Sequence, residues 1–112
     1  MVVNGMESGL EKGKNKIKNE IKNFFDENKI SYKEDENHIK IACEMFYVDF
    51  LKYAEISVKV GQDKYLTVTY DNGKLILAYE ETFPNDIIKK LEISKDEIQA
   101  VYYYNNKLVF LF

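Results

Sequence analysis

The chain contains no arginine and no tryptophan, and only one cysteine, one histidine and one proline among 112 residues. A single cysteine excludes an internal disulfide framework, so a cytoplasmic protein is expected. Without arginine, guanidinium groups cannot form paired hydrogen bonds with phosphate or carboxylate. His38 and Cys43 cannot supply the four ligands of a structural zinc site, and their spacing on a strand predicts opposite faces. We therefore expect no metal, no cofactor and no cysteine–histidine catalytic pair.

Long apolar runs are also missing, because no stretch approaches the roughly 18 apolar residues that a membrane span requires. The composition is that of a globular domain, with 46% hydrophobic and 31% charged residues and a net charge of −3. Seven Phe and nine Tyr give it many large rings for its length. We expect a flexible N-terminal arm over residues 1–7 and a single domain over residues 8–112.

One amphipathic helix is predicted near the N-terminus. Ser8 and Glu11 have the spacing of a capping box, in which each side chain binds the free backbone N–H of the other residue. A stripe of apolar residues follows at near-helical spacing as far as about Asn28: Leu10, Ile17, Ile21, Phe24 and Phe25.

Beyond the helix the apolar period becomes two, which predicts strands. Asn72-Gly73 is typical of a two-residue hairpin turn, and it would pair Tyr70 with Leu75 and Leu66 with Tyr79. Asn105-Asn106 predicts a second hairpin, at the C-terminus, which would pair Tyr104 with Lys107 if the turn has two residues. Pro84 predicts a short helix through Leu91, and Ser94 with Glu97 predicts a single capped turn. The fold class expected is α+β, with the helix packed on a mostly antiparallel sheet of six to seven strands and a short helix before the C-terminal hairpin.

A lysine-rich face of the N-terminal helix is the candidate nucleic-acid surface. Five lysines lie within eleven residues against one acid, Glu20, which is enough charge for sequence-independent contact with a phosphate backbone: Lys12, Lys14, Lys16, Lys18 and Lys22. Aromatic residues that could stack on bases lie elsewhere in the sequence, and a lysine-rich helix face is also typical of ordinary solvated surface.

Asp49, Glu55 and Lys59 form the one pattern with an enzymatic interpretation. Restriction-type nucleases carry an Asp near one strand and an acid-x-Lys pair on the next, which hold a metal ion and polarise water. The helix–strand–strand order here is distantly similar. Ser57 stands where the second acid would be, however, and no Pro-Asp dipeptide is present. A polar, solvated strand face explains the same residues.

Two further surfaces are candidates for protein contact. The period of residues 45–53 is ambiguous between helix and strand, and Phe46, Phe50 and Tyr53 form a possible partner patch there. The C-terminal hairpin is apolar on both faces, which predicts an interface in addition to core. Its tyrosine-bearing face suits this role because tyrosine buries a large ring while its hydroxyl stays hydrated: Tyr102, Tyr104 and Val109.

The function these observations favour is a small non-enzymatic binding module that acts by protein–protein contact and forms a homodimer. An accessory or inhibitor protein of a phage or another mobile element would fit this size. Two alternatives stay open: a nucleic-acid-binding protein that uses the Lys12–Lys22 face, and a divergent metal-dependent nuclease around Asp49, Glu55 and Lys59.

Overall fold

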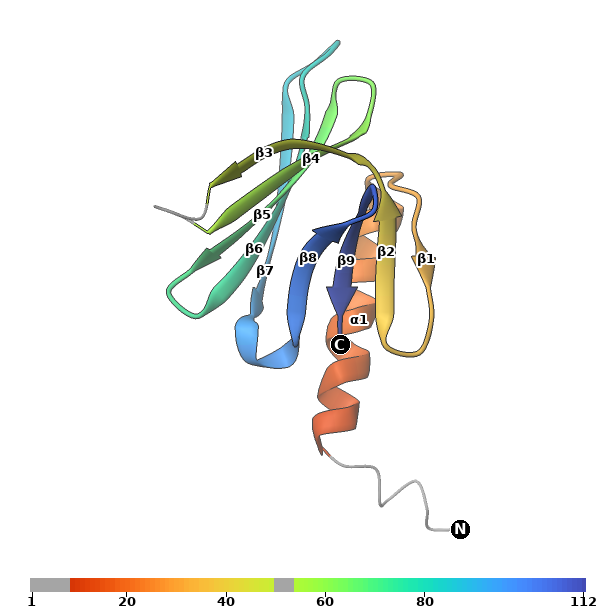
Figure 1. Cartoon of the computed structure of the whole chain (residues 1–112), viewed down its shortest axis with the longest axis vertical. Coiled ribbons are helices and arrows are strands. Elements are labelled where there is room, and N and C mark those ends of the chain that lie inside the picture. Colours follow the sequence, from red (N-terminus) through yellow and green to blue (C-terminus); the bar gives the residue numbers. More distant parts are fainter. Residues whose placement is uncertain (1–8, 50–53) are drawn as a thin grey trace.

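The computed structural model describes residues 9–49 and 54–112, with side chains for residues 16–49 and 54–112. The described residues form one α-helix, one short 3-10 helix and nine strands in two antiparallel sheets (Figure 1). The predicted arm over residues 1–7 lies outside the described part. Within the described residues, no helix combines the length and hydropathy needed to cross a bilayer.

The two sheets have different strand orders. The four-stranded sheet has the order β1-β2-β9-β8, with β1 at Lys33–Glu34, β2 at His38–Ala42, β8 at Ala100–Tyr104 and β9 at Lys107–Leu111. The five-stranded sheet is a meander of consecutive strands: β3 at Glu44–Asp49, β4 at Glu55–Gly61, β5 at Lys64–Asp71, β6 at Lys74–Glu81 and β7 at Ile87–Ser94.

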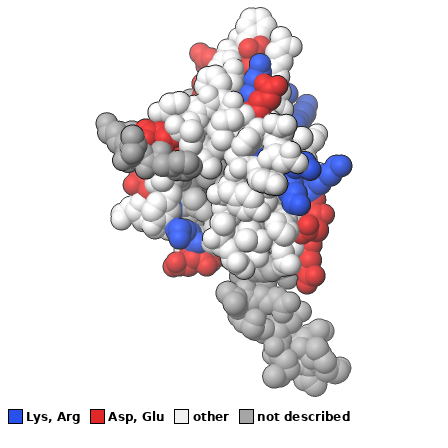
Figure 2. All heavy atoms as spheres, viewed as in Figure 1, with Lys and Arg blue, Asp and Glu red and all other residues white. Residues whose placement is uncertain are grey.

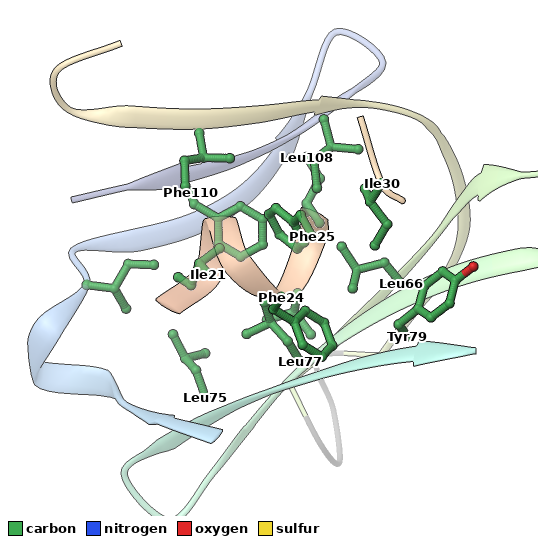
Figure 3. Packing of buried hydrophobic residues seen from close by; sticks show 14 of the residues in the cluster. Ile21, Phe24, Phe25, Ile30, Leu66, Leu75, Leu77, Tyr79, Leu108 and Phe110 are labelled. Atoms are coloured by element: carbon green, nitrogen blue, oxygen red, sulfur yellow. The ribbon is translucent and has the colours of Figure 1, made fainter. Parts of the chain in front are cut away.

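Helix α1, at Gly9–Glu27, lies behind the four-stranded sheet in Figure 1 and joins the two sheets into one core. Four residues of its predicted apolar stripe, Ile17, Ile21, Phe24 and Phe25, are buried, and the side chain of Leu10 lies outside the described set. Figure 3 shows the stripe between Phe110 of β9 and Leu77 of β6. The ring of Phe25 packs on that of Phe110 at 5.6 Å between centroids. The helix therefore fills the space between the sheets, where burial of apolar side chains supplies most of the stability.

The chain passes from the four-stranded to the five-stranded sheet at a single residue, Cys43, which separates β2 from β3, and it returns between Ser94 of β7 and Ala100 of β8. The backbone N–H of Cys43 donates to the carbonyl of Asn106 at 3.1 Å, and the Tyr103 hydroxyl donates to the Cys43 carbonyl at 3.1 Å. Both bonds connect this corner to the β8–β9 hairpin. They satisfy backbone groups that a strand leaving its sheet would otherwise leave without partners.

Both predicted hairpin registers are confirmed. Tyr70 faces Leu75 and Leu66 faces Tyr79 across the β5–β6 turn. Tyr104 faces Lys107 across the Asn105-Asn106 turn. The capped turn after Ser94 is also confirmed, because the Ser94 hydroxyl accepts a hydrogen bond from the N–H of Asp96 at the start of helix η2, Lys95–Glu97.

The prediction of a single sheet of six to seven strands is wrong in detail, because the strands divide into two sheets of four and five. Alternating apolar residues reveal strands and their inner faces but not which strands share a sheet. The division depends on the bend at Cys43, where β2 continues almost without interruption into β3.

The predicted helix from Pro84 to Leu91 is also wrong, because Ile87–Ser94 is strand β7. All eight of its residues pair with β6. In this register Leu91 lies opposite Leu77 and Ile93 lies opposite Leu75, so both side chains reach the core face. Ladder hydrogen bonds along the open edge of β6 therefore outweighed the local helical signal of the proline.

We expect Asn72→Ala with Gly73→Ala to lower the free energy of unfolding by about 2 kcal/mol, because both residues have positive φ, at 52° and 82°, and alanine is strained there. Urea denaturation would measure the loss. Gln62→Ala is the matched control, because Gln62 is exposed in the β4–β5 turn and does not itself have a positive φ. An unchanged midpoint for the double variant would contradict the turn's role.

Candidate functional site

Only part of the predicted lysine face of α1 has described side chains. Lys12 and Lys14 belong to α1, but their side chains lie outside the described set. Lys16 is exposed to solvent. As a nucleic-acid surface this face stays a prediction.

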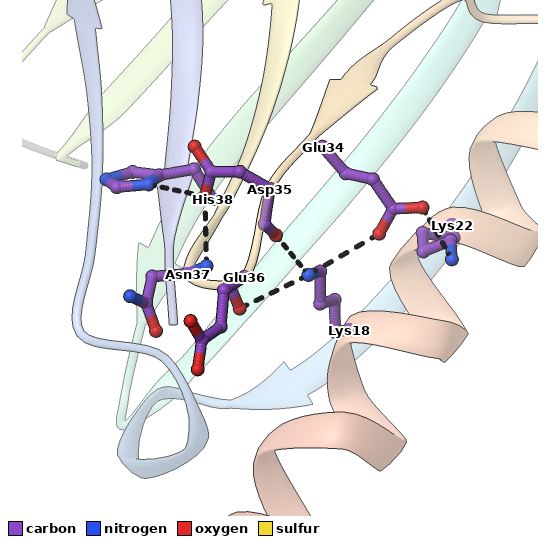
Figure 4. A network of polar contacts seen from close by, with 7 residues as sticks. All are labelled: Lys18, Lys22, Glu34, Asp35, Glu36, Asn37 and His38. Carbon is purple, nitrogen blue, oxygen red and sulfur yellow. Dashed lines mark hydrogen bonds and ion pairs between the residues drawn. The ribbon is translucent and has the colours of Figure 1, made fainter.

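Lys18 and Lys22 turn toward β1 (Figure 4). Their ammonium groups lie 3.4 and 2.8 Å from the two carboxylate oxygens of Glu34. The hydrogen bond from Lys22 lowers the pKa of Glu34, and the nearby charge of the same lysine adds to this effect. The positive charge at this end of the lysine face is therefore partly neutralised within the chain.

The β1–β2 turn continues the same network. Lys18 also donates to the backbone carbonyl of Asp35, and the Asp35 carboxylate lies 2.9 Å from both the Asn37 N–H and His38 Nδ1. The hydrogen bond with His38, followed by that from Asn37, lowers the pKa of the Asp35 carboxyl. His38 thus takes part in an ordinary turn contact that holds β1 and β2 against α1.

The nuclease-like residues do not come together as one cluster. Asp49 lies opposite Glu55 across the β3–β4 ladder, but Lys59 is four residues farther along β4, about 13 Å away. Ser57, which stands where the second acid would be, is buried and accepts a hydrogen bond from the Thr67 hydroxyl at 2.9 Å. Among the described residues, no group of three or more His, Cys, Asp or Glu side chains could hold a metal ion.

Cys43 is a buried free thiol at the corner between the sheets. Its sulfur lies 3.3 Å from the Ile41 carbonyl, and burial raises the pKa of the thiol. A thiol that is buried and protonated is a poor nucleophile. Its place in the structure is that of a small core residue.

Strand β3 carries the largest run of exposed apolar side chains in the described chain. Met45 is 39% exposed, Phe46 62%, Tyr47 48% and Val48 43%. β3 is an edge of the five-stranded sheet, and in Figure 1 it arches from the upper end of β2 across the upper part of the molecule. The register with β4 shifts between Met45 and Tyr47, and the Phe46 ring at this bulge packs on Tyr65 at 4.8 Å between centroids.

The other edge strands differ from β3. β1 has only two residues, and β7 carries the exposed Lys89 and Lys90. β8 borders the gap between the sheets, where Ala100 and Val101 help to line an apolar cleft of about 260 Å³. Short length and edge lysines are two ways in which proteins prevent unwanted strand pairing. β3 has six residues and no lysine or proline, so it lacks both.

Comparison with protein-family models, curated proteins and solved structures finds no match to this chain.

The structure places the predicted partner patch only in part. Phe46 is exposed on β3, as the patch requires, while Phe50 and Tyr53 lie outside the described residues. Sequence reasoning did not include Met45, Tyr47 and Val48. In the sequence these residues form an apolar run without alternation. Such a run fits a strand buried on both faces as well as a strand exposed on both faces.

The tyrosine-bearing face of the C-terminal hairpin lies on the outside of the four-stranded sheet. Tyr104 is 71% exposed and Tyr102 is 40% exposed, but Val109 is only 4% exposed. Val109 lies between Tyr102 and Lys40 in the ladder, and these longer neighbours cover it. It can therefore add little area to an interface, and self-association through this face stays a prediction that rests on the two tyrosines.

We expect Glu34→Gln to lower the denaturation midpoint at neutral pH, because it removes the carboxylate that binds Lys18 and Lys22. The pKa of Glu34 is lowered by folding. Its contribution is thus fully present above the ordinary glutamate pKa of about 4.3 and is lost as the pH falls through the folded-state value. The difference between wild type and variant should vanish at acid pH.

Glu36→Gln is the control for this change, since its carboxylate forms no ion pair with a described residue. A constant difference between wild type and Glu34→Gln across the acid range would contradict the ion-pair assignment.

Proposed function

We propose that this protein is a binding module that recognises an extended segment of another protein along the open edge of β3. The observation that carries the proposal is the run from Met45 to Val48 on an edge strand, with every side chain more than a third exposed. An edge strand offers unpaired backbone groups, and added strands use them for affinity while side-chain contacts supply specificity.

The shape of β3 supports this mode of recognition. Phe46 stands at the bulge and is held against Tyr65, so a large ring is presented in a defined position. Ordering a ring before binding reduces the entropy lost on association. Aromatic side chains are also the residues most enriched among those that dominate interface energies.

The charges at the two ends of β3 favour a different protein as the partner over a second copy of this chain. In a symmetric antiparallel pairing of two β3 strands over their full length, Glu44 of one copy would lie opposite Asp49 of the other, at both ends. Like charges directly opposite each other destabilise strand pairing. A partner segment with apolar residues at its centre and Lys or Arg near its ends would instead meet both acids with opposite charge.

The β3 variant, Phe46→Lys with Val48→Lys, tests this proposal. The matched control is Phe83→Lys with Ile88→Lys, because both of its residues are exposed apolar side chains away from β3. Each of the three proteins serves as bait in a lysate of the native host. A protein retained by the wild type and the control, but not by the β3 variant, is then purified and titrated by calorimetry. We expect the β3 variant to bind it at least about 30-fold more weakly.

Amide hydrogen exchange on the purified complex supplies the second measurement. New protection is expected within residues 44–49, where the added strand would form its hydrogen bonds. Equal binding by the wild type and the β3 variant, or protection confined to other strands, would contradict the proposal. The proposal would also be contradicted if the β3 variant retained from the lysate every protein that the wild type retains.

A further inference from the structure

The outer face of the four-stranded sheet carries positive charge and exposed rings. Its strand residues include no acid, and the Asp35 carboxylate of the β1–β2 turn contacts it at His38. The ladder registers and burial place on this face Lys33, His38, Lys40, Ala42, Ala100, Tyr102, Tyr104, Lys107, Val109 and Leu111. None of these is Asp or Glu, although the whole chain has a net charge of −3. Figure 2 shows the same face as largely uncharged, with basic side chains near β1 and β2 and acidic side chains next to them.

Three lysines on this face surround a pocket of about 230 Å³. Ser31, Tyr32 and Ala42 complete its lining, and no acidic residue takes part. Lys33 lies directly opposite Lys40 in the β1–β2 ladder, which is an unfavourable pairing of like charges. Lys107 lies opposite Ala42, one diagonal step from Lys40.

These lysines lack the neutralising contacts found elsewhere in the chain. Lys33, Lys40 and Lys107 form no ion pair with a described residue. Glu34 is the nearest acid along β1, but its carboxylate is directed to the other side of the sheet, where it binds Lys18 and Lys22. A concentration of positive charge around a mostly apolar hollow is a suitable environment for a phosphate group.

Two exposed tyrosines continue the same face. Tyr104 lies opposite Lys107, and Tyr102 is two residues away on the same side of β8, about 7 Å along the strand. That spacing lets two neighbouring unstacked bases each cover one ring. The sequence predicts a lysine face only on the helix, apart from the aromatic residues, whereas the sheet brings Lys33, Lys40 and Lys107 beside the tyrosines.

We infer that this face binds single-stranded nucleic acid, with phosphate groups held at Lys33, Lys40 and Lys107 and bases stacked on Tyr102 and Tyr104. A charged groove beside stacking rings is the usual basis of such binding, and it needs no arginine. A duplex keeps its bases stacked on one another and cannot use the tyrosines. This activity is independent of the β3 edge and goes beyond the proposed function.

Fluorescence anisotropy with a labelled single strand of about 12 nucleotides, titrated at several salt concentrations, tests the inference. Lys33→Gln, Lys40→Gln and Lys107→Gln together should lower affinity at least about tenfold near 50 mM salt. The slope of log affinity against log salt concentration should fall in magnitude by about two, since each of the three phosphate contacts on a single strand contributes about 0.7. Lys59→Gln, Lys89→Gln and Lys90→Gln, three exposed lysines of the five-stranded sheet, make the same charge change and should have little effect.

Tyr102→Leu with Tyr104→Leu should weaken binding about fivefold or more while leaving the salt slope unchanged, because stacking involves no counterion. The duplex of the same sequence should bind more weakly than the single strand. Circular dichroism of each variant confirms that the fold is kept.

Three results would overturn the inference. One is the absence of binding by the wild type at low salt. Another concerns the helix lysines. If Lys12→Gln, Lys14→Gln and Lys16→Gln together weaken binding more than the three substitutions on the sheet, the site lies on the helix. The third is a wild-type dimer by light scattering that Tyr102→Lys with Tyr104→Lys converts to a monomer, because a second copy would then occupy this face.

Discussion

The crossing at Cys43 is the constraint on which the rest of the structure depends. One residue carries the chain from the four-stranded sheet to the five-stranded sheet, so the end of β2 and the start of β3 fix how the two sheets meet. Hydrogen bonds to Asn106 and from Tyr103 hold the crossing to the C-terminal hairpin. The two sheets open away from this corner, and the apolar stripe of α1 fills the space between them.

The same crossing determines which surfaces remain available. Because β3 leaves the first sheet and pairs only with β4 among the described strands, it becomes an edge with apolar side chains exposed on both faces. The four-stranded sheet has α1 on its inner face, so its outer face is open to solvent and holds the lysines and tyrosines of distant segments. The two proposed surfaces thus follow from one arrangement of the chain, while their chemistry differs: one is apolar with acidic ends, and the other is basic with exposed rings.

Local features of the fold were predictable from the sequence. Asn72-Gly73 and Asn105-Asn106 set both hairpin registers, because residues with positive φ leave few alternatives for a short turn. The stripe of α1 was predictable for a similar reason, since its period is set by helix geometry alone. The error at Ile87–Ser94 arose where tertiary pairing with β6 outweighed a local signal.

The candidate sites were less predictable, because they depend on long-range placement. Phe46 was identified from its size and context, yet only the bulge and the edge position show that it is exposed. The cluster of Lys33, Lys40 and Lys107 has no sequence signature, since its members come from three strands that become neighbours only when the sheet forms. Charge runs in the sequence pointed instead to α1, where Glu34 from β1 partly neutralises the lysines.

Amide hydrogen exchange of the free protein, resolved residue by residue by NMR, tests most directly whether the edge of β3 is open. An open edge bonded on one side to β4 should show alternating slow and fast exchange along residues 44–49, next to uniformly slow exchange in the central strands β5 and β6. Uniformly slow exchange along β3 would mean that its outer edge is already covered. That result would contradict the account of β3 as the surface that receives a partner strand.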